Sequence, residues 1–215
     1  NISLDYNAGL GGNQSYGLKT NDHKTDVEYR DLLKRSLENA LSVSEPDTHV
    51  FYWCDETYIG LIQDIYRELG IENKRVCLWI KNAQNPTPKV AFNKCYEPCV
   101  YGVRGKPHLS KGDQSLNEVL NKEVGTGNRL IDDFLDLMDI WLVKRLSGNE
   151  YEHPTSKPPT LYQKAIRRCT KPGDIILDGF GGSGSSLIAG EQLKRKVYLV
   201  EIEPIFCDVI IKRYE

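Results

Sequence analysis

A glycine-rich turn follows a short apolar stretch toward the carboxyl end of the sequence. Ile175 to Leu177 lead into DGFGGSGSS, residues 178–186, and then into an apolar stretch of helical character. Glycines let the backbone pass close to a ligand and adopt positive φ. A strand, a glycine-rich turn and a helix in this order are typical of sites for nucleotide-type cofactors. Glu201 closes the next predicted strand, where an acid can accept hydrogen bonds from both hydroxyls of a ribose.

Two other interpretations of this turn stay open. Gly179, Gly181 and Gly184 also spell G-x-G-x-x-G, which is compatible with a nicotinamide-dependent oxidoreductase. The glycines could also form a tight turn that binds nothing. The sequence contains no G-K-[ST], which excludes a P-loop nucleotide site within it.

A second motif, HPTSKPP, occupies residues 153–159, directly before a predicted helix. With the segments that follow it, this motif closely resembles the S-adenosylmethionine-dependent DNA amino-methyltransferases, in the permuted order with the cofactor half last. The resemblance is specific over residues 151–215, in KPGDIILDGFGGSGSSLIAGEQ and YLVEIEPIFCDVIIKRYE. It is looser upstream, in VFYWCDETYIG, VCLWIKN and YEPCVYG, which are similar to strands of the catalytic half.

The resemblance implies S-adenosylmethionine as the cofactor, and the residues suit it. Lys157 and the Thr155 hydroxyl can bind the methionine carboxylate, and Asp178 can accept from the ammonium. Glu201 is expected to bind the ribose, and Phe180 and Ile202 to contact the adenosine. The full expected set of cofactor-binding residues is Thr155, Lys157, Asp178, Phe180, Gly181, Ser183, Gly184, Glu201 and Ile202. No metal is expected: Cys95 and Cys99 form a weak zinc signal without a second pair.

The catalytic element of the family, an acidic residue or serine followed by Pro-Pro-Tyr, does not occur in this sequence. One expectation places it just before Asn1, and the other treats Asp5 and Tyr6 as a degenerate substitute. In the family this element hydrogen-bonds the exocyclic amine of a base that is flipped out of the duplex. The amine nitrogen then attacks the methyl group of the cofactor. The expected target is adenine N6 rather than cytosine N4. The alternative is a catalytically incompetent partner that binds S-adenosylmethionine and DNA.

Positive charge is concentrated in one part of the chain. Residues 74–111 contain eight Lys or Arg and one Asp or Glu, in a chain of net charge −2. Trp79, Phe92, Tyr96 and Tyr101 are interleaved with them, a mixture that suits phosphates and stacked bases. We expect double-stranded DNA to bind here, although a solvated surface with inward-facing aromatics would have the same composition. The expected phosphate contacts are Lys89, Lys94, Arg104 and Lys106.

Hydrophobic spacing predicts alternating helices and strands. Helices are expected at 25–43, 56–69, 130–146, 160–169, 185–193 and 204–214, and strands at 50–54, 75–80, 97–102, 174–177 and 197–201. Residues 81–94 are expected to form a loop. This pattern predicts an α/β fold: a Rossmann-like, mostly parallel sheet with helices on both faces. The resemblance to the DNA amino-methyltransferases implies, in addition, a small inserted target-recognition region.

The chain length of 215 residues suggests a single methyltransferase domain. Its expected parts are a catalytic half at 1–101, a target-recognition insertion at 102–150 and a cofactor half at 151–215. The helix expected at 130–146 could read bases or serve packing in a homodimer. No apolar run reaches the roughly 18 residues of a membrane span, and six sparse cysteines suggest reduced thiols. We therefore expect a cytoplasmic protein of bacterial, phage or mobile-element origin.

Overall fold

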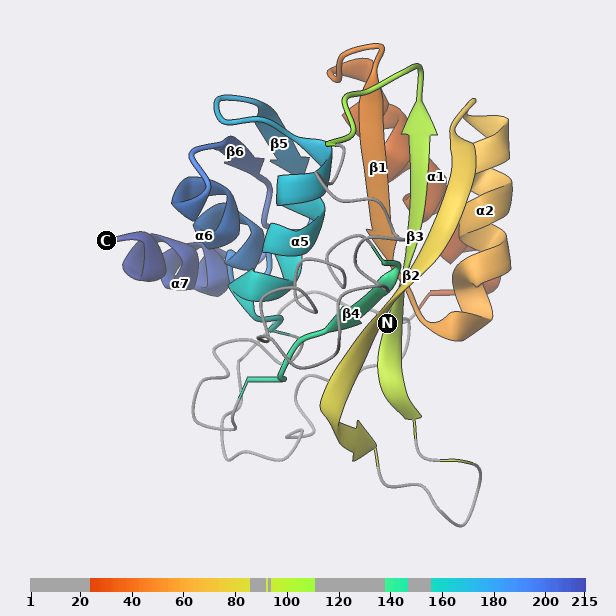
Figure 1. Cartoon of the computed structure of the whole chain (residues 1–215). Helices are drawn as coiled ribbons and strands as arrows, with labels where there is room; N and C mark the ends of the chain where they lie inside the picture. Colours follow the sequence, from red (N-terminus) through yellow and green to blue (C-terminus); the bar gives the residue numbers. More distant parts are fainter. Residues whose placement is uncertain (1–23, 86–91, 93, 111–137, 147–155) are drawn as a thin grey trace, which may run out of the picture.

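A computed structural model describes residues 24–85, 92, 94–110, 138–146 and 156–215, in which the strands form two sheets. The first part of the chain contains α1 (Asp26–Ser42), β1 (Thr48–Trp53), the short 3-10 helix η1 (Glu56–Tyr58), α2 (Ile59–Glu68), β2 (Glu72–Asn85), β3 (Lys94–Arg104) and β4 (Ile140–Leu142). The second part contains α5 (Pro159–Cys169), β5 (Ile175–Asp178), α6 (Ser185–Gln192), β6 (Lys196–Leu199) and α7 (Pro204–Tyr214) (Figure 1).

The larger sheet has the strand order β1-β3-β2-β4. β3 runs antiparallel to both β1 and β2, and β4 pairs with β2 in parallel. The sheet is therefore mixed, which refines the expectation of a mostly parallel one. The antiparallel pairs arise because consecutive strands β2 and β3 fold back on each other, and β3 then lies between β2 and β1.

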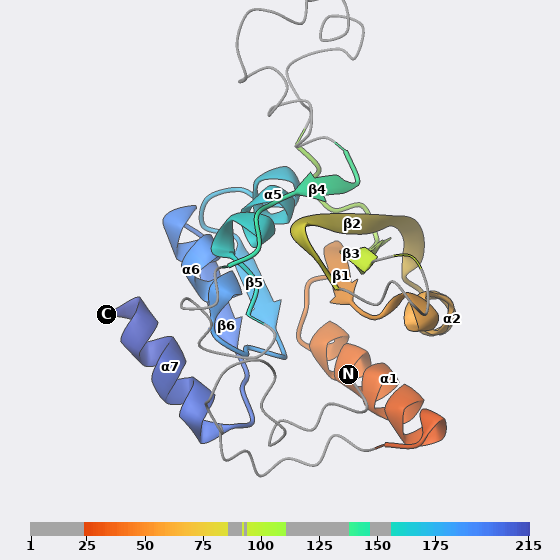
Figure 2. The ribbon, with the colours of Figure 1, turned by 90° about the horizontal axis from the view of Figure 1, so that it is seen from below.

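Both faces of this sheet are covered by helices, as the sequence predicted. On one face Val100 of β3 packs with Leu33 of α1 and with Ile62 and Ile65 of α2. On the other face Cys99 belongs to a core that includes Leu161 of α5. Neighbouring strand residues point to opposite faces, so the two cores are separated by the sheet. Figure 2 shows α1 and α5 on opposite sides of β1 to β3.

The smaller sheet consists of β5 and β6, which pair in parallel from Ile175↔Lys196 to Asp178↔Leu199. Parallel strands need a crossover, and α6 supplies it. In Figure 1, α5 lies between the larger sheet and α6. Because the strands are parallel and in register, their carboxyl ends meet at one edge of the sheet. Asp178 and the chain that leads to Glu201 therefore lie side by side.

Two element predictions are wrong. The helix expected at 130–146 is contradicted at Ile140–Leu142, which form β4. Pairing with β2 overrides the local helical pattern there, because Trp141 enters the core beside Cys77 and Trp79. The loop expected at 81–94 is contradicted at residues 81–85, which belong to β2, and at Lys94, which begins β3 and pairs with Asn85.

Within the part of the chain that the structure describes, no helix has the length and apolar character needed to cross a membrane.

Candidate functional site

The glycine-rich turn is anchored to the chain that follows β6. The Gly181 amide donates to the Val200 carbonyl at 2.8 Å, and the Val200 amide donates to the Asp178 carbonyl at 2.9 Å. Gly184 caps α6 with a φ of 76°, a left-handed conformation that glycine adopts without strain. These bonds hold the turn over the carboxyl ends of β5 and β6, the edge where ligands bind in open α/β sheets.

The backbone of the turn is accessible on its outer side. Among the described residues, a Cβ atom added at Gly179 would meet no atom within 4 Å, and one at Gly182 would meet only the Phe180 carbonyl at 4.0 Å. The turn can therefore lie directly against a ligand. At Gly181 the situation is reversed, since a Cβ would lie 2.6 Å from Leu199 Cδ2. Gly181 thus lets the turn approach β6, while Gly179 and Gly182 leave room beside the backbone among the described residues.

The Glu201 carboxylate is oriented by two backbone amides. Its Oε2 accepts from the Gly182 amide at 2.6 Å and its Oε1 from the Glu203 amide at 2.9 Å. Each oxygen keeps a further lone pair. Glu201 can therefore accept hydrogen bonds from neighbouring hydroxyls, as expected of a ribose acceptor, and it also ties the glycine-rich turn to the end of β6.

Asp178 ends β5 beneath the turn. Its Oδ1 accepts from the Phe180 amide at 3.0 Å and its Oδ2 from the Ser186 hydroxyl at 2.6 Å. Burial raises the pKa of Asp178, while these two hydrogen bonds and the charge of Lys157 act in the opposite direction. A half-buried carboxylate whose hydrogen bonds within the described part of the chain come from neutral donors is suited to accept a ligand's ammonium, because the new cation would offset the cost of removing the charge from water.

Lys157 lies across from this turn, on the segment that leads into α5. Its Nζ is 3.3 Å from Glu97 Oε2 on β3 and 5.3 Å from the centroid of the Trp53 ring at the end of β1. The side chain is only 14% exposed. An ammonium has three donors, so Lys157 keeps the capacity to bind a ligand carboxylate as well.

Two apolar side chains flank the turn and remain exposed. Phe180 is 57% exposed and Ile202 is 77% exposed among the described residues. The Phe180 ring meets Tyr52 of β1 edge to face, with centroids 6.1 Å apart. Apolar surfaces of this kind beside Glu201 are compatible with contact to an adenine ring.

Ser183 connects the turn to the lysine segment. Its hydroxyl accepts from Ser156 Oγ at 3.1 Å, and both serines are buried. Ser183 is therefore near the expected site, but it contacts protein groups there. Thr155, the neighbour of Ser156, lies outside the described residues.

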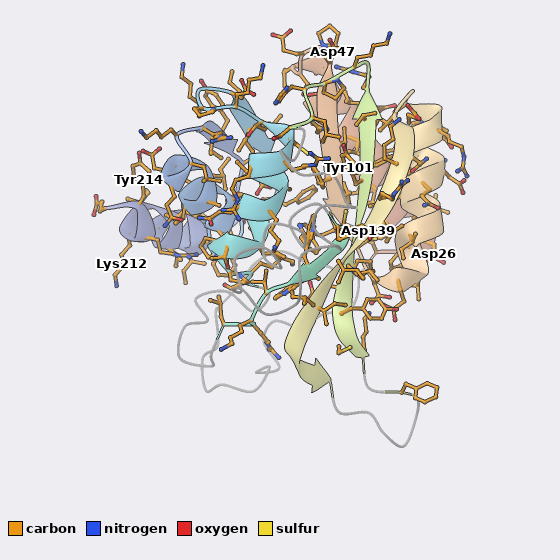
Figure 3. All side chains as sticks on the ribbon, viewed as in Figure 1. Asp26, Asp47, Tyr101, Asp139, Lys212 and Tyr214 are labelled. Carbon is orange, nitrogen blue, oxygen red and sulfur yellow. The ribbon has the colours of Figure 1, made fainter. Side chains whose placement is uncertain are left out.

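The expected DNA contacts are spread over different surroundings. Lys94 forms ion pairs with Asp55 and Glu56. Arg104 donates to the carbonyl of Leu41 in the last turn of α1 and to the carbonyls of Ser44 and Glu45 just after the helix. Lys106 is exposed, and its backbone amide donates to Asp47, which Figure 3 labels near one end of β1. Lys89 lies outside the described residues, as do Asp5 and Tyr6.

The structure adds two residues that sequence reasoning did not select. Glu97 pairs with Lys157, and Trp53 lies under the same ammonium. A signal for Glu97 existed, because it is the single acidic residue in the basic segment 74–111. Trp53 had no comparable signal, since an aromatic residue in an apolar strand is usually part of the core.

Comparisons with known proteins agree on one family. A family model described as DNA methylase, of the N6/N4 type, matches residues 3–213. The chain is 33% identical over 134 residues to the type II methyltransferase M2.DpnII of Streptococcus pneumoniae, covering 61% of this chain and 47% of that protein. It is 26% identical over 171 residues to M.HinfI of Haemophilus influenzae, covering 72% and 44%. The matches thus span about half the length of these two relatives.

Solved structures share the fold. The M1.HpyAVI–SAM complex superposes with a TM-score of 0.67 at 23% identity, covering 89% of this chain and 84% of that one. The PvuII DNA methyltransferase, described as cytosine-N4-specific, gives a TM-score of 0.67 at 15% identity and covers 92% and 74%. The expected fold class is therefore confirmed.

Proposed function

Because the chain belongs to the N6/N4 DNA methylase family, we propose that it transfers a methyl group from S-adenosylmethionine to an exocyclic amine of a DNA base. The observation that carries this proposal is the arrangement of Asp178, Glu201 and Lys157 around an open glycine-rich turn. S-adenosylmethionine contains an ammonium, a ribose and a carboxylate. The three side chains offer one complementary group to each of them.

The residues fit this cofactor on the evidence of their own surroundings. The Asp178 carboxyl accepts from two neutral donors, each Glu201 oxygen keeps a lone pair beside Gly182, and the Lys157 ammonium has donor capacity left. Bound S-adenosylmethionine would supply an activated methyl group. The chain's own contribution is to orient that group and to exclude water, and this role requires no metal or covalent intermediate.

Titration calorimetry with S-adenosylmethionine and with NAD tests the cofactor assignment. We expect binding of S-adenosylmethionine and none of NAD, since a pyrophosphate would need a phosphate site where Asp178 presents a carboxylate. Binding of NAD alone would identify an oxidoreductase and reject the proposal.

The target base is proposed as adenine N6, in the setting of a type II restriction-modification system like those of the relatives. Methylated duplex DNA should be digested to nucleosides and analysed by mass spectrometry. N6-methyldeoxyadenosine is the expected product. If the product is N4-methyldeoxycytidine, the chain is still a DNA amino-methyltransferase, but its target base is cytosine and the adenine proposal is wrong.

Catalytic competence depends on the element that grips the amine. If Asp5 and Tyr6 form it, the chain transfers methyl groups and Asp5→Ala abolishes transfer while S-adenosylmethionine binding is retained. If it lies in sequence before Asn1, a chain extended upstream gains activity that the 215-residue chain lacks. A chain that binds both ligands and stays inactive when extended would be a non-catalytic partner.

We assign base readout to the region 102–150. Its residues 102–104 belong to β3 and its residues 140–142 form β4 beside β2, so these described parts of the region are anchored in the larger sheet. Exchange of residues 111–137 for the corresponding segment of a relative should change the methylated sequence and leave cofactor affinity unchanged.

A further inference from the structure

The ion pair of Lys157 involves an acid that belongs to the other half of the chain. Glu97 lies on β3, and its two oxygens bind two different lysines: Oε1 is 2.5 Å from Lys81 Nζ, and Oε2 is 3.3 Å from Lys157 Nζ. Lys81 also lies over the Trp79 ring at 5.2 Å, as Lys157 lies over Trp53 at 5.3 Å. Two lysines, each against a tryptophan, therefore hold one carboxylate between them.

This arrangement is partly shielded from water. The side chains of Lys157, Lys81 and Glu97 are 14%, 20% and 33% exposed, respectively. Burial by itself raises the pKa of Glu97, but the Lys157 and Lys81 ammonium groups outweigh it and lower the pKa below its ordinary value. Glu97 is thus an anion at neutral pH, and it acts on Lys157 with little screening.

Lys157 has a second acid within electrostatic reach. This acid is Asp178, the proposed acceptor for the cofactor ammonium: the Lys157 charge opposes the rise in the Asp178 pKa that burial causes, yet among the described residues the ion pair of Lys157 is with Glu97. If Lys157 paired with Asp178, neither side chain would be available to the ligand, and its carboxylate and its ammonium would each lose a binding partner. Glu97 attracts the ammonium from the side of β3 and opposes this pairing.

From this geometry we infer that Glu97 is a positioning residue: it holds Lys157 away from Asp178, so that the lysine and the aspartate remain separate partners for the two charged ends of an amino-acid moiety. The inference rests on the proposed function, because it assumes that the ligand is S-adenosylmethionine. It gives the larger sheet a direct role in cofactor binding through β3.

Calorimetric titration of the Glu97→Gln variant tests the inference. Glutamine has nearly the same shape but no charge, so Lys157 is released toward Asp178. We expect affinity for S-adenosylmethionine and for S-adenosylhomocysteine to fall about ten-fold, as for the loss of one charged hydrogen-bond partner. 5′-Methylthioadenosine has no amino-acid moiety, so its affinity should stay within about two-fold of the unaltered chain.

A double-mutant cycle with Lys157→Met shows whether Glu97 acts through the lysine. In the Lys157→Met background, Glu97→Gln should have almost no further effect. Additive losses, or an equal loss for 5′-methylthioadenosine, would mean a general structural role and overturn the inference. Glu72→Gln is the matched control, since Glu72 pairs with Lys74 on the same strand as Lys81, is 67% exposed and is expected to leave all three affinities unchanged.

The outcomes separate the two proposals. If the unaltered chain does not bind S-adenosylmethionine, the proposed function fails and this inference fails with it. If the unaltered chain binds and Glu97→Gln binds equally well, only the inference is overturned. NMR titration of Glu97 provides a readout without ligand: in Lys157→Met its pKa should rise, and an unchanged pKa would contradict the coupling.

Discussion

At the scale of single residues, the cofactor site depends on a carboxylate whose charge is unfavourable before a ligand arrives. Burial raises the pKa of Asp178, and its hydrogen bonds come from the neutral Ser186 hydroxyl and Phe180 amide. The charged form is the one that can bind an ammonium. Affinity for S-adenosylmethionine should therefore be highest above this raised pKa and should fall as the pH decreases through it.

Asp178→Asn separates binding from stability. We expect calorimetry to show that the affinity of Asp178→Asn for S-adenosylmethionine is weaker by roughly 1–3 kcal/mol. This affinity should no longer fall as the pH decreases, because asparagine does not titrate. An acid whose pKa is higher in the folded protein than in the unfolded chain lowers the free energy of unfolding at every pH above its folded pKa. This loss of stability disappears when the pH falls below the pKa of the unfolded chain. The variant should therefore unfold at a higher temperature than the unaltered chain at neutral pH. A lower melting temperature together with normal binding would show that Asp178 is merely structural.

Glu201 should behave differently, because it also holds the turn. Glu201→Ala removes the acceptor of the Gly182 and Glu203 amides, and binding should weaken by roughly 1–3 kcal/mol. Glu201→Gln keeps one amide acceptor and should lose less affinity in the same titration. Equal losses in the two variants would argue that the charge alone matters.

At the scale of elements, α6 is brought against β6 by a glycine. A Cβ at Gly190 would lie 2.2 Å from Val197 Cγ2, so a larger residue at this position would not fit unless Val197 moved. Gly190→Ala should lower the free energy of unfolding by roughly 1–3 kcal/mol, as overpacking does. Urea denaturation measures this, and Val197→Ala should restore part of the loss.

The matched control is Gly60 in α2, where an added Cβ would meet no described atom within 4 Å. Gly60→Ala should be neutral or stabilising by up to about 1 kcal/mol, because alanine favours helix. If both variants were destabilised equally, steric contact at Gly190 would not be the cause.

At the scale of the whole molecule, DNA is expected to bind the basic segment 74–111. Charge reversal of Lys89 and Lys106 should weaken duplex binding and reduce the dependence of log affinity on log salt by about two, measured by fluorescence anisotropy. Unchanged affinity would place the DNA interface elsewhere, and the next candidates are the basic residues in and just after α5: Lys164, Arg167, Arg168 and Lys171.

Arg104 lies in the same segment but is engaged inside the fold. Its guanidinium donates to the carbonyls of Leu41, Ser44 and Glu45 at the end of α1. Arg104→Met should therefore lower the free energy of unfolding by roughly 1–3 kcal/mol with little change in the salt dependence of DNA binding. Unchanged stability together with a weaker salt dependence of DNA binding would instead identify Arg104 as a phosphate contact.

The sequence by itself determined the features whose signals lie within a few neighbouring residues. Thr25 and Glu28 form a capping box at the start of α1, and the helix begins where the sequence predicted. The glycine-rich turn, Asp178 and Glu201 were likewise readable, because a parallel strand, turn, helix and strand place both acids at one sheet edge.

Only the tertiary structure decided the contacts between distant segments. Ile140–Leu142 form a strand because β2 offers them an edge, although their own pattern is helical. Glu97 meets Lys157, and Arg104 meets the end of α1, because the order β1-β3-β2 and the position of α5 bring them together. Charge and spacing along the chain specify which groups can pair, but sheet register and helix packing select the partner.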